Sequence, residues 1–190
     1  LLAGVSRFCA PRGGEATVAA MIAAWTAAAN SEGRGAERLR LAATMLALAA
    51  VHVEPNLRAR QVYAWAMDKR WVGLDPGGRA VMAAALLAAT GKTALPAELE
   101  RLASSDELRQ AVGWGLAIRL CRRLGAGTRV SLLTSELRRD GDKLALWFHP
   151  SRGQLASDQV LGDLKALCQW RGLEPELRVS ERPDEGRTAD

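Results

Sequence analysis

Residues 37–51 read ERLRLAATMLALAAV, and this stretch decides the fold. After Arg40 the segment is almost wholly apolar and has no polar face, which is typical of a helix buried on all sides. Alanine is its commonest residue, and small side chains favour close packing between helices. We therefore expect a mainly α-helical protein in which Leu41–Val51 is the most buried element.

Further helices are expected on both sides of this segment. Thr17–Ala29 has apolar residues at helical spacing and is followed by a break at residues 30–33. Downstream, Asn56 after Pro55 is placed to cap a helix that runs to about Lys69.

The next helix has clear signals at both ends. Asp75 followed by Pro76 predicts a helix start, because Asp is a common N-cap and proline fits the first helical position. Gly91 is the expected end of that helix.

The longest helix is predicted after the sequence SSDE at residues 104–107. This is a capping box, in which the first serine hydroxyl and the glutamate carboxylate each satisfy a free backbone N–H group. Apolar residues then recur every four positions over residues 108–124. Gly125 and Gly127 are expected to end the helix.

Beyond residue 127 the hydrophobic period changes. Arg129–Leu137 and Lys143–Phe148 predict two strands, joined at Asp140-Gly141-Asp142, which is a strong hairpin signal. A helix over about Ser157–Arg171 and a strand over Glu176–Ser180 follow. We expect a β-β-α-β unit with a three-stranded antiparallel sheet.

Composition and charge limit the classes of partner. The chain has 190 residues, of which 48% are hydrophobic, enough for a substantial core. Its net charge of +5 favours phosphate-bearing partners. Cys9, Cys121 and Cys168 are scattered and belong to no Cys/His cluster, so we expect neither a disulfide framework nor a zinc site, and a reducing compartment, the cytoplasm.

No membrane segment or signal peptide is expected, because every run of 18 residues contains charged side chains and no basic region precedes Leu1. The first residue is not Met, so we expect the chain to begin inside a longer protein.

Catalytic patterns are missing from the sequence. The histidines His52 and His149 have no nucleophile pattern beside them, and we interpret them as a structural or surface residue and a turn residue. Asp140 and Asp142 flank a hairpin glycine, which turn chemistry explains. There is no GxGxxG, P-loop or GxSxG sequence. We expect no catalytic residue in this chain.

The order of these elements resembles the C-terminal region of the exopolyphosphatase / guanosine pentaphosphate phosphatase family. The resemblance extends to about Ser180 and depends on pattern and order rather than on one motif. The segments that carry it are ERLRLAATMLALAA (37–50), NLRARQVYAWAM (56–67), GLDPGGRAVMAAALLAATGK (73–92) and DELRQAVGWGLAIRLCRRLGAG (106–127).

The resemblance implies that catalysis and accessory substrate binding lie in different parts of a longer protein. An actin-like catalytic module upstream would hydrolyse polyphosphate or guanosine pentaphosphate with Mg²⁺. This chain would be the non-catalytic C-terminal part, inactive alone, which helps to bind the substrate and contributes contacts to a homodimer. No cofactor is expected in this chain.

The helical part of that family in turn resembles HD-domain metallophosphohydrolases, whose metal site needs His and Asp donors on facing helices. The positions that the resemblance assigns to these donors are Ala47, Leu48, Arg60 and Gly91 here. None of these side chains can ligate a metal, and the arginine would repel one. We therefore expect no metal and exclude an HD-type hydrolase.

The expected organisation has three parts. Residues 1–127 form a degenerate HD-like helical domain, so the fold class is mainly α. Residues 128–180 form a small α+β domain with the antiparallel sheet. Residues 181–190 are polar, contain Pro and Gly, and are expected to be a disordered tail.

Basic side chains form three groups along the chain. Cations at the end of a helix complement its dipole, which explains the first group without any ligand. The alternative is a positive track for a polyanion, since the planar fork of arginine matches phosphate oxygens. The first group is Arg119, Arg122, Arg123 and Arg129, the second is Arg138, Arg139 and Lys143 on the hairpin, and the third is Arg58, Arg60, Lys69 and Arg70. The first and third groups are the candidate polyanion-binding residues.

Two functional classes stay open. The first is the accessory part of a polyphosphate or pentaphosphate phosphatase. The second is a stand-alone helical interaction or nucleic-acid-binding module, which would need aromatic rings for base stacking beside basic residues. Trp71, which follows Lys69 and Arg70, and Trp147 are the candidates for such rings.

Overall fold

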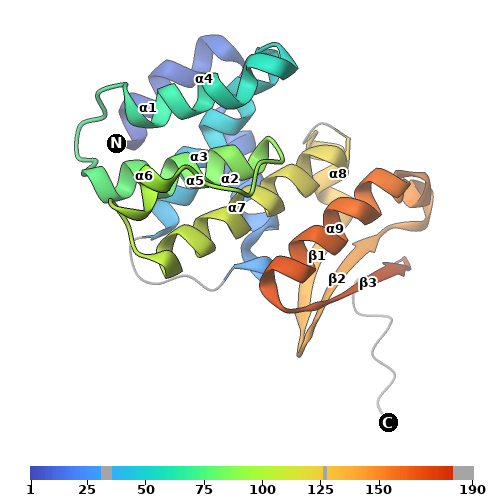
Figure 1. The fold of residues 1–190 in the computed structure, drawn as a ribbon. Coiled ribbons are helices and arrows are strands. Elements are labelled where there is room, and N and C mark those ends of the chain that lie inside the picture. The colour runs from blue at the N-terminus through green and yellow to red at the C-terminus, as the bar shows by residue number, and fades with distance from the viewer. Residues whose placement is uncertain (31–35, 126–127, 182–190) are drawn as a thin grey trace.

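A computed structural model describes residues 1–30, 36–125 and 128–181, and Figure 1 shows helices followed by a small sheet. The mainly α fold class with a small sheet unit is thus confirmed. The α-helices are α1 (Leu2–Cys9), α2 (Ala16–Trp25), α3 (Ala36–Ala49), α4 (Pro55–Met67), α5 (Pro76–Ala89), α6 (Ala97–Glu100), α7 (Ser105–Arg123), α8 (Arg129–Leu133) and α9 (Asp158–Arg171). The other elements are the strands β1 (Ser135–Asp140), β2 (Lys143–Phe148) and β3 (Glu174–Val179) and the 3-10 turns η1 (Ala10–Arg12), η2 (Ala27–Ala29), η3 (Ala50–His52) and η4 (Pro150–Leu155).

Helix α5 lies at the centre of the helical part. It packs against α3, α4 and α7, and every residue from Ala80 to Ala89 is buried. Helix α3 is buried from Ala42 to Ala49, but the chain then turns outward through η3 and leaves Val51 40% exposed. The predicted segment is buried without interruption from Ala42 to Ala50 and α5 from Ala80 to Ala89, so these two helices are the most buried elements to a similar extent.

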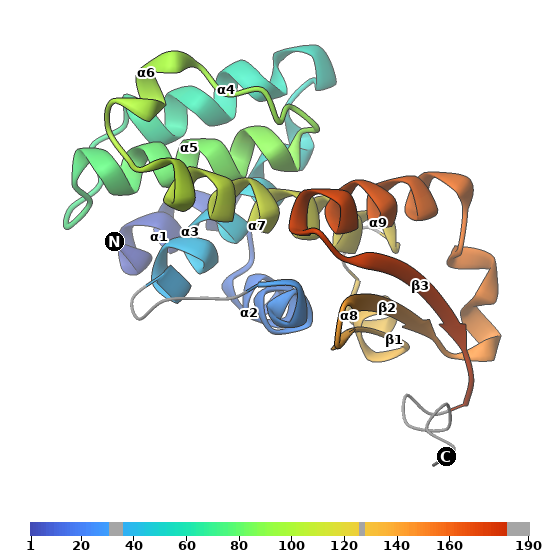
Figure 2. The same ribbon diagram turned by 60° about the horizontal axis from the view of Figure 1, so that its bottom comes forward.

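The contact between α5 and α7 is unusually close. A Cβ atom at Gly115 of α7 would overlap the carbonyl oxygen of Ala85 and lie 2.6 Å from the Ala88 Cβ and 2.8 Å from the Ala89 nitrogen. Only a glycine facing alanines allows this approach. Figure 2 shows α7 between α5 and α9, so the same helix links the helical part to the sheet unit.

The sheet is mixed, which corrects the predicted antiparallel sheet. β1 and β2 are antiparallel from Ser135↔Phe148 to Asp140↔Lys143, and Gly141 has a φ of 60° in the hairpin loop. β3, however, pairs with β2 in parallel from Lys143↔Glu174 to Phe148↔Val179. The reason is α9, which carries the chain back along the sheet before β3 begins, as a parallel pair requires. In Figure 2 this helix lies over the sheet.

Two local predictions are also wrong. The segment Arg129–Leu137 was expected to be a strand, but its first half is the helix α8, whose N-cap Thr128 accepts a hydrogen bond from the Ser131 amide. Asn56 is not a cap, because Glu54 occupies the N-cap position and Pro55 the first position of α4.

Other helix ends are confirmed. The Asp75 carboxylate accepts a hydrogen bond from the Gly78 amide at 2.7 Å, and Ser104 and Glu107 form the expected capping box. Gly91 follows α5 with a φ of 95°, a conformation that favours glycine.

The hydrophobic cluster continues across the expected boundary at residue 127. Leu124 at the end of α7 belongs to the same cluster as Leu144 and Phe148 of β2 and Leu164 of α9. Three predictions fall outside the described residues: part of the break at 30–33, the end of the long helix at Gly127, and most of the tail over 181–190.

Replacing Gly115 with alanine should lower the free energy of unfolding by about 2 kcal/mol or more, because overpacking typically costs ~1–3 kcal/mol and this contact involves backbone. The matched control is Gly162→Ala in α9, where a Cβ meets nothing within 4 Å. That variant should gain about 1 kcal/mol from helix propensity. Urea unfolding followed by circular dichroism measures both, and a Gly115→Ala protein as stable as the control would contradict the close contact.

Candidate anion-binding site

Arginines from two helices converge on one polar pocket with a volume of about 360 Å³. One arginine comes from the first turn of α4 and three come from the last turns of α7. Of the lining residues that the structure describes, one is apolar. The described lining residues are Arg58, Ala89, Thr90, Arg119, Arg122, Arg123 and Gln159. We call this the arginine pocket.

Arg119 occupies the space beside Gly91, the residue without a side chain that follows the C-terminal end of α5. A Cβ atom at Gly91 would overlap the Arg119 guanidinium and lie 3.0 Å from its Cζ. Arg119 itself is one helical turn after Gly115, the point where α7 touches α5. The close helix contact therefore brings this arginine against the C-terminal end of α5.

Asp163 of α9 holds two of the arginines in place. Its carboxylate accepts hydrogen bonds from Nε of Arg119 at 2.8 Å and from Nε of Arg123 at 2.6 Å. Arg123 also donates from Nη1 to the Gln159 side chain at 2.7 Å. The Asp163 side chain is only 11% exposed, so this pair of bonds is more than a loose surface contact.

Arg58 reaches the pocket from α4 and is fixed by backbone carbonyls. Its Nη2 donates to the carbonyl oxygens of Val51 and Val53, both at 3.0 Å. These carbonyls lie at the end of η3, so Arg58 satisfies the turn that follows α3. Its Nη1 makes no hydrogen bond within the part of the chain that the structure describes.

Of the four arginines that line this pocket, Arg122 is the one for which the described residues provide no acceptor. Within residues 1–30, 36–125 and 128–181 its guanidinium forms no hydrogen bond and no ion pair. Burial, and to a smaller extent repulsion from Arg58, Arg119 and Arg123, together lower the pKa of Arg122 to about 10. A pKa of about 10 still leaves the group charged at neutral pH. The pocket thus contains a partly buried cation without a counter-anion among the described groups.

The structure separates the remaining predicted residues from this pocket. Arg129 lies on α8, where it is 3.9 Å from Glu15 with both side chains exposed. Arg60 borders a different pocket beside Tyr63, because residues two apart on a helix point about 200° from one another. Lys69 lies 4.7 Å from the ring centre of Phe8. Arg70 is exposed after the end of α4.

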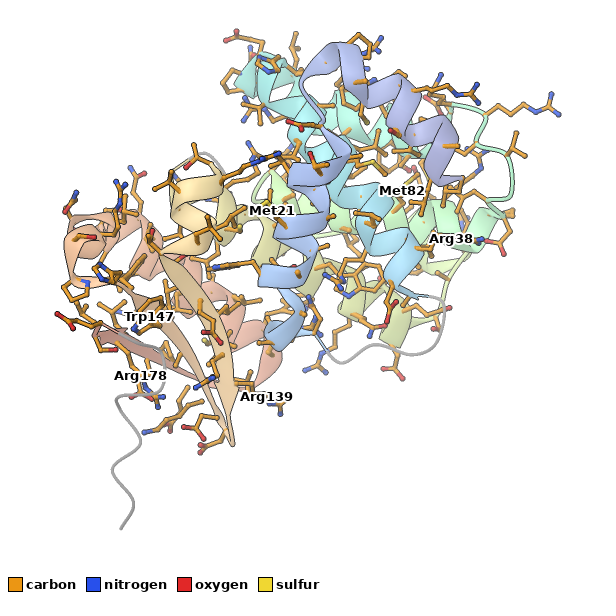
Figure 3. All side chains as sticks on the ribbon, turned by 180° about the vertical axis from the view of Figure 1, so that it is seen from behind. Met21, Arg38, Met82, Arg139, Trp147 and Arg178 are labelled. Carbon is orange, nitrogen blue, oxygen red and sulfur yellow. The ribbon has the colours of Figure 1, made fainter. Side chains whose placement is uncertain are left out.

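The two tryptophans that could stack with bases are not available for stacking. Trp71 is 5% exposed and donates its Nε1 hydrogen bond to the Trp65 carbonyl. Trp147, labelled on the sheet in Figure 3, is 7% exposed and donates to the Ser180 hydroxyl at 2.7 Å.

The hairpin cations form a separate group. Figure 3 shows Arg139 and Arg178 on the sheet unit. Arg138 is 3.4 Å from Glu136, and Arg178 pairs with Glu176 at 3.0 Å. The charges of Arg138 and Arg178 are therefore balanced locally, while Arg139 donates to the Gly141 carbonyl.

The resemblance assigns the metal-donor positions to Ala47, Leu48, Arg60 and Gly91. Ala47 and Leu48 are buried in α3, while Arg60 and Gly91 lie as described above. Among the described residues no group of three His, Cys, Asp or Glu side chains is placed to hold a metal ion. No helix in those ranges combines the length and apolar character needed to cross a bilayer.

The histidine and cysteine side chains have structural surroundings. Nδ1 of His149 lies 2.7 Å from the Ser151 hydroxyl and caps η4, as expected of a turn residue. All three cysteines are buried. Burial raises the pKa of Cys9 to about 12 and that of Cys168 to about 11, and it raises the pKa of Cys121 well above its usual range. A neutral, buried thiol is a poor nucleophile.

Because of this burial, the native protein should not react with Ellman's reagent at pH 8, and all three thiols should react in guanidinium chloride. Raising the pH to 9 should change little, since the thiolate forms only as the pH approaches the raised pKa values. Rapid labelling of one thiol in the native state would show that its burial is wrong.

A glycine pair tests the geometry of Arg119. Gly91 and Gly73 have φ values of 95° and 74°, and a Cβ at Gly73 meets nothing within 4 Å. Both alanine variants should lose about 1–2 kcal/mol through backbone strain. Gly91→Ala should lose about 1 kcal/mol more, because it displaces Arg119 from the partly buried Asp163. The additional loss of stability should vanish when Gly91→Ala is made in an Arg119→Ala protein. If it persists there, the contact with Arg119 is not the cause of the additional loss.

Comparison with known proteins adds no family to these observations. No protein-family model matches the chain, and no curated protein matches it at a significant level.

Proposed function

We propose that this chain is the non-catalytic C-terminal part of an exopolyphosphatase / guanosine pentaphosphate phosphohydrolase, and that its arginine pocket helps to hold the polyphosphate-type substrate. The observation that carries the proposal is Arg122. It is charged and partly buried, it faces three other guanidinium groups, and it lacks an acceptor among the described residues.

A bound anion would remove the cost of this arrangement. A charge taken out of water without a partner is destabilising, and neighbouring like charges add to that cost. Phosphate oxygens suit the site because a guanidinium can bind two of them side by side, with bonds stronger than those between neutral groups.

The dipole of α7 explains only part of the pocket. Cations in the last turn of a helix are each stabilised by ~0.3–1 kcal/mol, which accounts for Arg122 and Arg123 on α7. It does not account for Arg58, which reaches the same pocket from the first turn of α4. Arg58 is held there by the Val51 and Val53 carbonyls, and an anionic ligand would in addition use the Nη1 group that these carbonyls leave open.

Catalysis belongs elsewhere in this proposal. Hydrolysis of a phosphoanhydride needs an oriented water and neutralisation of the developing charge by metal or fixed donors. The described carboxylate nearest these arginines, Asp163, is already bound by two of them. We assign the chemistry to an upstream actin-like module with Mg²⁺, in a cytoplasmic protein in which this chain also contributes to a homodimer.

A nucleic-acid-binding module, the alternative function, has less support. Its phosphates could also bind the arginines, but single-strand binding relies on exposed aromatic rings for stacking. Trp71 and Trp147 are buried, and no aromatic side chain is among the described residues that line the pocket.

Binding of medium-length polyphosphate to the whole chain tests this function. Arg122→Gln should weaken binding about tenfold or more, because a hydrogen bond to a charged group contributes about 1.5–3 kcal/mol and 1.4 kcal/mol is tenfold. By analogy with nucleic acids, the slope of log affinity against log salt should fall by about 1. The control is Arg139→Gln on the hairpin, which should bind as the wild type does. Isothermal titration calorimetry gives both values, and a phosphate-release assay with Mg²⁺ should show no hydrolysis.

Three results would contradict the proposal in different ways. Equal binding by the Arg122→Gln and Arg139→Gln variants would place the site outside the arginine pocket. Phosphate release by the purified wild-type chain would show that it is catalytic. Tighter binding of a single-stranded oligonucleotide than of polyphosphate with the same charge would support the nucleic-acid alternative.

A further inference from the structure

We infer that a second pocket, near the start of α7, binds a small zwitterion with an apolar body, the chemical class of apolar amino acids and dipeptides. The pocket has a volume of about 460 Å³, and Trp170 borders it, so we call it the Trp170 pocket. This inference goes beyond the proposed function and does not depend on it, because the Trp170 pocket and the arginine pocket share no described lining residue.

The Trp170 pocket is well separated from the arginine pocket. Arg109 of α7 lines the first and Arg122 lines the second. The two residues are 13 positions apart on the same helix, which corresponds to about 20 Å at the rise of an α-helix. A ligand in one pocket is therefore not in contact with the other.

Segments that are distant in the sequence form this pocket. Leu95 lies in the loop after α5, Glu100 is the last residue of α6, and Trp170 belongs to the last turn of α9. Helix α7 packs against both α6 and α9, and Figure 1 shows it running between them. The pocket thus depends on the packing of these helices and is not a feature of one loop.

The floor and one wall of the pocket are apolar. Leu108 and Val112 lie one helical turn apart on α7 and are 3% and 0% exposed, yet both border the pocket, so they form its floor. The Trp170 indole is fixed beside them, because its Nε1 donates a hydrogen bond to the Arg109 carbonyl oxygen at 2.9 Å. A fixed aromatic ring next to buried aliphatic side chains favours an apolar group of a ligand.

Two opposite charges border the same pocket without pairing. The side chains of Glu100 and Arg109 are exposed lining residues. Within the part of the chain that the structure describes, neither side chain forms a hydrogen bond or an ion pair, with the other or with any further residue. Glu100 can therefore accept from a ligand ammonium, and Arg109 can donate to a ligand carboxylate.

This combination of charges selects against other ligand classes. Glu100 would repel a phosphate chain, whereas the Asp163 carboxylate at the arginine pocket is already bound by two arginines. A simple carboxylic acid would leave Glu100 without a partner, and a simple amine would leave Arg109 without one. Complementary charges give specificity, so a molecule that carries both an ammonium and a carboxylate on an apolar body fits best.

NMR titration of the whole chain tests the ligand class. The Trp170 indole N–H signal, assigned with a Trp170→Phe variant, reports binding at this pocket. L-phenylalanine is compared with phenylpropionate, which lacks the ammonium, and with phenethylamine, which lacks the carboxylate. Phenylalanine should bind about threefold or more tightly than either, since exposed ion pairs contribute modestly. L-leucine should bind at least tenfold more tightly than L-alanine, because each buried methylene improves affinity about fourfold.

Two variants assign the charges to their partners. Glu100→Gln should bind phenylalanine and phenylpropionate equally, because the ammonium then has no carboxylate to meet. Arg109→Gln should bind phenylalanine and phenethylamine equally. The matched control is Arg101→Gln, which removes an exposed charge next to Glu100 that is not among the described lining residues and should keep both preferences. Tighter binding of phenylalanyl-leucine than of phenylalanine would identify a dipeptide as the ligand within the same class.

The inference fails on any of three results. Equal binding of phenylalanine, phenylpropionate and phenethylamine by the wild-type chain would show that the charges do not recognise a ligand. Equal binding of the neutral N-acetylphenylalanine amide would show that only the apolar surface matters. Absence of binding by all of the amino acids and the dipeptide would show that the pocket is not a site for this class. None of these results concerns polyphosphate binding at Arg122, which is measured separately.

Discussion

The close approach of α7 to α5 at Gly115 positions everything around the arginine pocket. Because α7 carries no side chain at this point, its backbone lies against the alanines of α5, and the helix cannot rotate or slide without a clash. Arg119 then falls one turn later, beside the glycine that ends α5. On its other side α7 packs against α9, which brings Asp163 to Arg119 and Arg123. The positions of the charged groups in the pocket thus follow from the packing of small residues between α5 and α7.

Features of the fold that depend on neighbouring residues could be predicted from the sequence, and those that depend on distant contacts could not. The caps at Asp75 and Ser104 are local hydrogen bonds between groups three residues apart, so their sequence signals were reliable. The direction of β3 follows from the path of α9 across the sheet, which no strand pattern contains. At α8, the change of hydrophobic period after residue 127 suggested a strand, but the Thr128 cap starts a helical turn instead.

The same distinction applies to the site. Clusters of arginine along the chain indicated Arg119, Arg122 and Arg123 as a group, and the structure places them together at the end of one helix. Their grouping with Arg58 could not be foreseen, because it depends on where α4 and α7 meet. The presence of Asp163, about 40 residues from its partners along the chain, decides which guanidinium groups remain free. No property of residue 122 in the sequence distinguishes it from residue 123.

The participation of α9 in the pocket has an evolutionary consequence. Asp163 and Gln159 belong to the segment after residue 127, whereas the arginines that they bind belong to the segment before it. Recombination at this boundary would be harmless if the two parts were independent modules. Here it would separate Arg119 and Arg123 from Asp163, the carboxylate that balances their charge. A foreign C-terminal segment would have to restore both the carboxylate and its position. The two segments are therefore expected to be inherited together and to change in a correlated way.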